Sequence, residues 1–83
     1  MQTIEQVKHL LTDMLSLGAR GAALTAETAL LGNLPELDSM AVIIVITAME
    51  ERFGIALDDD DISASVFQTV GTLSALVDRK LAA

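Results

Sequence analysis

Cysteine, tryptophan and tyrosine are absent from this chain, and two phenylalanines are its only aromatic residues. Without cysteine, the protein can contain neither disulfides nor thiolate metal sites. A chain of 83 residues is small enough that such cross-links are often needed, so packing of the core must stabilise the fold. With 52% hydrophobic residues and 2% aromatics, that core is aliphatic and methionine-rich. This composition favours packed helices.

Basic residues are scarce as well: 5 Lys and Arg against 12 Asp and Glu give a formal net charge of -7. This charge repels nucleic acid and anionic membrane surfaces, and it favours partners with basic protein surfaces. The longest apolar run, residues 40–46, is far shorter than the roughly 20 residues of a membrane span. The N-terminus does not resemble a signal peptide. We therefore expect a cytoplasmic monomer with no nucleic acid or membrane partner.

The first apolar pattern recurs at spacings of three and four residues, as on one face of an amphipathic helix. Its members are Ile4, Val7, Leu10, Leu11, Met14 and Leu17. Thr3 with Gln6 matches a capping box, and Gly18 is a suitable C-terminal stop. The pattern predicts a helix over residues 3–17.

Residues 18–37 interrupt this periodicity with Gly, Ala and Thr, and they contain five scattered leucines. Loops of this length are usually functional or fixed by their own side chains, and the leucines favour the second interpretation. Pro35 disfavours helix at Leu34 and, with Gly32 and Asn33, marks a turn.

A second helix is predicted over residues 39–53, with Asp38 as N-cap and Gly54 at its end. A helical wheel predicts a core face of Val42, Ile46, Met49 and Phe53, with Ile43 at its edge. It places Ala41, Ile44 and Ala48 on the outward side with Glu51. Two interpretations of Ile44 stay open: the long loop covers it, or it forms an exposed docking patch with Met40 beside Ser39.

The remaining chain predicts two further helices. Residues 55–57 are apolar but have no partner strand, so we expect a connection there. The aspartates at 58–61 can cap a short third helix over residues 59–67, and Thr69 can cap a fourth over residues 70–81. Arg79 and Lys80 suit the last turn of that helix. The sequence thus predicts one all-α domain over residues 1–83: a four-helix bundle with a short third helix and a long loop between helices one and two.

Ser39 lacks the surroundings of a catalytic nucleophile, which needs an adjacent base and an oxyanion site. The single histidine, His9, falls on the first predicted helix as a surface residue, and no glycine-rich turn adjoins Ser39. We therefore expect no catalytic residue and no enzyme. Ser39 either extends the cap that Asp38 supplies or carries an attached phosphate, which a helix N-terminus favours.

The aspartate run lacks the alternating spacing and the glycine of a calcium loop. A solvated helix cap is the favoured interpretation, loose divalent-cation binding is the alternative, and no metal site is predicted.

Three segments resemble the acyl carrier protein family, which includes peptidyl carrier domains, and the resemblance as a whole extends over nearly the whole chain. Asp38-Ser39-Met40 resembles the family's Asp-Ser-Leu signature, and residues 49–55 and 67–73 resemble the end of its second helix and the start of its last. The resemblance implies that a phosphopantetheinyl transferase, using coenzyme A and magnesium, attaches 4'-phosphopantetheine to Ser39, with Asp38 as a flanking recognition residue. The prosthetic thiol would hold acyl, aminoacyl or polyketide intermediates as thioesters. Partners would include an acyl or aminoacyl ligase, a ketosynthase, an acyltransferase or a thioesterase.

One departure from the family concerns the docking surface. Carriers of fatty acid synthesis typically have acidic residues at the positions of Ala41 and Ile44, whereas only Glu50 and Glu51 remain acidic here. The resemblance therefore implies a specialised pathway and largely apolar docking, through Met40, Ala41, Ile44, Glu50 and Glu51. The alternative function is a small helical protein-interaction module, in which Ser39 stays unmodified and Ile44 contacts a partner helix.

Overall fold

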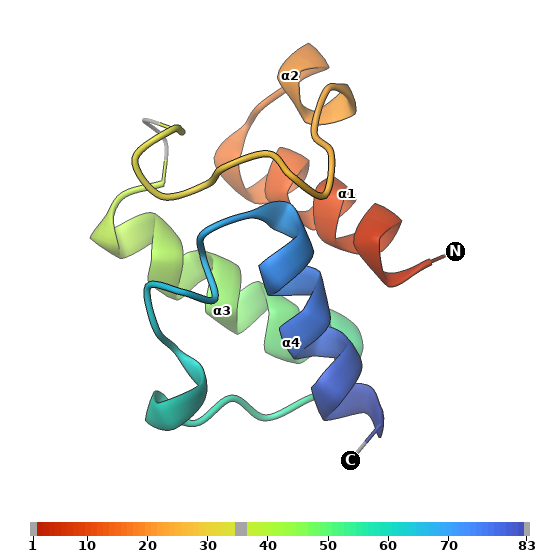
Figure 1. Ribbon diagram of the computed structural model, residues 1–83, viewed down its shortest axis with the longest axis vertical. Helices are drawn as coiled ribbons and strands as arrows, with labels where there is room; N and C mark the ends of the chain where they lie inside the picture. The colour runs from red at the N-terminus through yellow and green to blue at the C-terminus, as the bar shows by residue number, and fades with distance from the viewer. Residues whose placement is uncertain (1, 35–36, 83) are drawn as a thin grey trace.

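The protein is a bundle of helices in the computed structural model, which describes residues 2–34 and 37–82. Within these residues the elements are α1 (Thr3–Leu15), α2 (Ala19–Ala22), α3 (Ser39–Phe53), the 3-10 helix η1 (Asp59–Asp61) and α4 (Val70–Ala82) (Figure 1). They include no strand, and the only bridge is an isolated antiparallel one between Ala29 and Thr69. The prediction of an all-α fold is confirmed. None of the described helices is long and apolar enough to cross a membrane.

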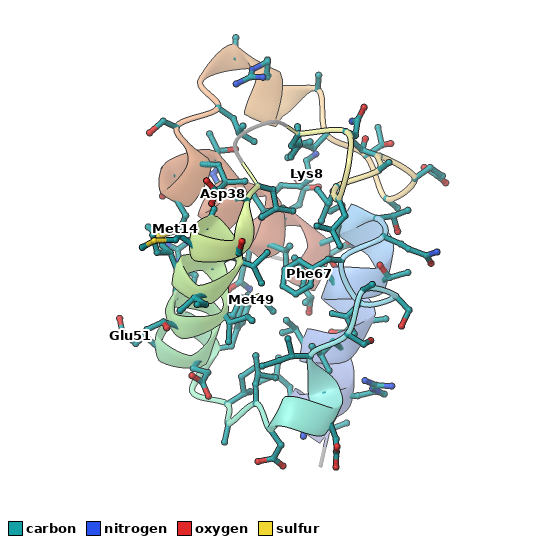
Figure 2. All side chains as sticks on the ribbon, turned by 90° about the vertical axis from the view of Figure 1, so that its left-hand side faces the viewer. Lys8, Met14, Asp38, Met49, Glu51 and Phe67 are labelled. Carbon is teal, nitrogen blue, oxygen red and sulfur yellow. The ribbon has the colours of Figure 1, made fainter. Side chains whose placement is uncertain are left out.

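The core lies between α1, α3 and α4, and the loop after α2 closes one end of it. Its largest fully buried side chains are aliphatic, as the composition predicted: Leu10, Leu11, Leu30, Met49, Leu73, Val7, Val45, Val70 and Val77. In Figure 2, Met49 lies on the side of α3 that faces Phe67, which is also buried. Elsewhere on α3, the side chains of Met40, Ile43 and Ile44 are exposed.

The first helix is shorter than predicted and begins differently. It ends at Leu15 because Ser16 takes the left-handed conformation with φ 53°, two residues before Gly18. The predicted capping box is wrong: Gln2 is the N-cap residue, and the Thr3 hydroxyl donates to Asp78 Oδ1 of α4 at 2.6 Å. Met14, which the pattern placed in the core, is 39% exposed, whereas Leu15 is buried.

The long loop is fixed by its own side chains, as predicted. Of its five leucines, four are buried and Leu31 is exposed. Backbone hydrogen bonds also tie it to the start of α4: the N–H of Leu30 donates to the Gln68 carbonyl at 2.9 Å, and the N–H of Gly71 to the Ala26 carbonyl at 2.9 Å. Gly32, with φ 81°, lies in a turn as expected, and Pro35 lies outside the described residues.

The sequence reasoning missed α2, which packs directly on α1. A Cβ atom at Gly21 would overlap the Thr12 side chain, so glycine permits this close approach. A helix of one turn is too short to show a periodic apolar pattern, and a glycine such as Gly21 is typical of a loop.

The connection from α3 to α4 also differs from its prediction. α3 has the predicted bounds, with Gly54 in the left-handed conformation, and residues 55–57 form no strand. The predicted helix over residues 59–67 is wrong, because only Asp59–Asp61 forms a single 3-10 turn. The Asp61 carboxylate accepts from the N–H of Asp58 at 3.0 Å, a local bond that competes with an α-helix. α4 begins at Val70 as predicted, capped by Thr69, whose hydroxyl accepts from the Thr72 N–H at 3.1 Å.

Candidate functional site at the start of helix α3

Ser39 is the first residue of α3 and is exposed to solvent. Asp38 fixes this position: its Oδ1 accepts from the N–H of Ala41 at 2.8 Å, and its carbonyl accepts from the N–H of Val42 at 2.9 Å. Leu37 and Ala41, on either side, are 6% and 9% exposed. The Ser39 hydroxyl is therefore exposed at a capped helix end, between buried residues two positions before and after it. Figure 2 shows Asp38 at this end of α3. The prediction that Asp38 is the N-cap is confirmed.

The electrostatics of this helix end suit an attached anion. The first N–H groups of an α-helix have no carbonyl partner within the helix, and the dipole of a 15-residue helix makes its N-terminus positive. A phosphodiester on Ser39 would lie where such groups are stabilised. The single histidine, His9, is exposed on α1 and lines two surface grooves to which Ser39 does not contribute.

Beyond Ser39, α3 carries large apolar side chains that face solvent. Met40 is 71% exposed, Ile43 is 64% exposed and Ile44 is 48% exposed. Of the two interpretations of Ile44, the structure supports the exposed one over cover by the loop. Ile43 was predicted at the edge of the core, and its exposure beside Met40 was missed.

The predicted core face of α3 is rotated relative to the observed one. The buried residues are Ala41, Val45 and Met49, whereas Val42, Ile46 and Phe53 are only half-buried. The outward placement of Ala41 is therefore wrong, and Val45 was missed. α3 is apolar nearly all round, so its sequence carries little information about which side faces α1 and α4.

The two glutamates at the end of α3 occupy different environments. Glu51 is exposed, as predicted. Glu50 is half-buried, and its Oε2 accepts from the N–H of Leu57 at 2.9 Å, so it holds the connection that follows the helix. Of the residues predicted for docking, Met40, Ile44 and Glu51 are on the surface.

One residue of the aspartate run, Asp61, forms an ion pair with a lysine of α4. Asp61 Oδ2 lies 2.7 Å from Lys80 Nζ of α4. The hydrogen bond from Lys80, and then that from the N–H of Asp58, hold the pKa of Asp61 below its ordinary value. In residues 2–34 and 37–82, no group of three or more His, Cys, Asp or Glu side chains is arranged to hold a metal ion.

Comparison with known proteins agrees with this site. Residues 5–79 match the family described as "Phosphopantetheine attachment site". The solution NMR structure of a holo acyl carrier protein from Nitrosomonas europaea superposes with a TM-score of 0.93, at 54% identity over 100% of both chains. Members of this family interact with phosphopantetheinyl transferases and with biosynthetic enzymes. The chain therefore belongs to the acyl carrier protein family, whose members are carriers and not enzymes, with 4'-phosphopantetheine as their prosthetic group.

Proposed function

We propose that Ser39 is the residue that bears 4'-phosphopantetheine, and that the protein presents acyl, aminoacyl or polyketide intermediates to the enzymes of a specialised pathway. One observation carries the proposal: an exposed serine hydroxyl at the first residue of α3, held by the cap of Asp38 and by buried neighbours. A hydroxyl held in this way is accessible to an enzyme and has a fixed position.

The residues at this helix end fit the prosthetic group. In the attachment step, a base supplied by the transferase takes the proton of the Ser39 hydroxyl, and the Ser39 oxygen bonds to the phosphorus that carries the pantetheine unit of coenzyme A. The bond to the other half of the pyrophosphate breaks, and adenosine bisphosphate leaves. The helix N-terminus then stabilises the negative charge of the phosphodiester. Oδ1 of Asp38 accepts a hydrogen bond from the Ala41 N–H, so this residue orients the helix end.

When attached, the prosthetic group supplies a thiol, which this cysteine-free chain lacks, and that thiol carries cargo as a thioester. The chain itself contributes a fixed point of attachment and a surface for partner enzymes.

A specialised pathway is supported by the surface of α3. Ile44 is exposed at a position where carriers of fatty acid synthesis typically have an acidic residue, and Met40 and Ile43 extend the apolar area beside Ser39. Apolar area of this kind favours partners that bury it. Ala41 contributes little to this surface, because it is packed in the core.

Incubation with coenzyme A, magnesium and a phosphopantetheinyl transferase of broad substrate range tests the attachment. We expect intact mass spectrometry to show the addition of one phosphopantetheinyl group to wild type and none to Ser39→Ala. A known carrier, loaded in parallel, shows that the transferase is active. Wild type that stays unmodified beside the loaded control would leave the alternative, a protein-interaction module with a free Ser39.

A second stage tests the pathway. The loaded protein is offered to the malonyl acyltransferase of fatty acid synthesis, with a fatty acid synthesis carrier as reference. We expect slower malonyl transfer to this protein, because Ile44 is exposed where carriers of fatty acid synthesis typically have an acidic residue. Equal rates would contradict the specialised pathway, but they would not contradict the attachment of phosphopantetheine to Ser39.

A further inference from the structure

The exposed apolar surface of α3 continues onto α1. Met40, Ile44 and Ala48 are four residues apart, so they form one row along the helix. At Ala48 this row meets a groove of about 260 Å³ between α1 and α3, lined by Leu10, Met14, Ala48, Glu51 and Arg52. In Figure 2, Met14 and Glu51 project on the same side of α3. The row and the groove together make a two-helix surface, which consists of Met40, Ile43, Ile44 and Ala48 of α3 with Met14 of α1.

The charges around the groove indicate what it can accept. Arg52 is directed to α1, where its Nη2 lies 3.8 Å from Asp13 Oδ2. Glu51 is exposed at the rim and makes no ion pair within the described residues. A partner that places an apolar side chain against Met14 and Ala48 can therefore add a Lys or Arg for Glu51. The net charge of -7 favours the same kind of partner and opposes a second copy of this chain.

The position of Ser39 identifies which partner must cover this surface. Enzymes that act on the cargo reach it at the end of the arm, whereas the transferase must bring phosphorus within bonding distance of the Ser39 oxygen itself. Ala48 lies about 14 Å along the helix axis from Ser39, at 1.5 Å per residue. A protein interface of ordinary size buries roughly 800 Å² on each side, enough to extend from Ser39 to the groove.

We propose, building on the proposed function, that the phosphopantetheinyl transferase docks on both α1 and α3. An apolar side chain of the enzyme enters the groove between Met14 and Ala48, and a basic side chain beside it pairs with Glu51. Met14 is thus a binding residue on a helix that does not carry the attachment site.

Loading kinetics test this with a matched pair of variants, Met14→Glu and Leu81→Glu. Both replace an exposed apolar side chain, 39% and 51% exposed, with a carboxylate, but Leu81 lies on α4, outside the groove. For Met14→Glu we expect the KM for the carrier to rise about tenfold with kcat nearly unchanged, as for the loss of an interface contact. Leu81→Glu should change neither by more than about twofold. Equal KM values for the two variants would overturn the proposal.

Methionine methyl NMR tests the same contact without a Met14 substitution. Ser39→Ala, labelled with ¹³C at the methionine methyl groups, is titrated with the transferase. The Met14 and Met40 signals should shift or broaden, while the signal of the fully buried Met49 should stay in place. A Met14 signal that is unchanged while Met40 responds would confine docking to α3 and overturn the two-helix proposal. Wild type that binds in this way but is never loaded would instead contradict the proposed function.

Discussion

At the scale of single residues, one carboxylate determines where α3 begins. Asp38 supplies the side-chain cap of this helix, and its partner is the N–H of Ala41, two residues beyond Ser39. We predict that Asp38→Ala lowers the free energy of unfolding by about 1 kcal/mol, the usual cost of removing such a cap. Urea unfolding followed by circular dichroism measures this, with an unchanged slope as the sign of an unchanged fold.

Asp38→Asn is the matched control, because asparagine caps as well as aspartate without the charge. It should unfold close to wild type. If Asp38→Ala were as stable as Asp38→Asn, the hydrogen bond to Ala41 would not fix the helix end, and the rigid placement of Ser39 would lose its main support.

Residue-level reasoning succeeded where a residue has a local role and was wrong where the role depends on packing. The cap of Asp38 follows from its type and position in the sequence. The half-buried Glu50, by contrast, reaches the N–H of Leu57, and Ala41 packs into the core. Neither fact can be read from spacing along a helix that is apolar nearly all round.

At the scale of elements, the sequence predicted the long helices and not the short ones. Repeated apolar positions and capping residues located α3 and α4 to within one residue. α2 and η1 are single turns without periodicity, so their conformations depend on tertiary contacts, such as that between Gly21 and Thr12. The connection around η1 is held to α4 by Lys80 and by the Thr72 hydroxyl, which donates to the Val66 carbonyl at 2.8 Å.

This connection should respond to pH through Asp61. Its pKa is lowered in the folded protein, chiefly by the hydrogen bond from Lys80, from an ordinary value of 3.8. A lowered pKa means that the ionised carboxylate stabilises the fold above pH 3.8, and that this contribution is lost as the pH falls through the folded pKa. We predict that Asp61→Asn lowers the Tm by no more than a few degrees at pH 7, since the pair is near the surface. Below the folded pKa of Asp61, the two proteins should have the same Tm.

Asp60→Asn makes the same change of charge one residue away, at an exposed side chain with no ion pair in the described structure. Differential scanning calorimetry over a pH series compares the three proteins. A Tm difference between wild type and Asp61→Asn that persists unchanged in acid would mean that the ion pair with Lys80 does not stabilise this connection.

At the scale of the whole molecule, the excess of acidic residues adds a long-range attraction to the apolar docking surface. A net charge of -7 on so small a protein draws basic partners from a distance, whereas Met40 and Ile44 act only on contact. The two contributions can be separated, because salt screens the first and leaves the second nearly unchanged. The screening length falls from about 10 Å at 0.1 M salt to about 3 Å at 1 M.

We therefore predict that kcat/KM for loading of Ser39 falls about tenfold between low and high sodium chloride, with kcat nearly constant, because electrostatic steering acts on association. Glu51→Gln should show a shallower dependence on salt than wild type, since Glu51 is the exposed carboxylate at the rim of the docking groove. Loading rates measured over a salt series, with circular dichroism to show that the fold persists, provide the comparison. A kcat/KM that does not change with salt would mean that apolar contacts alone govern recognition. The acidic surface would then not attract the transferase.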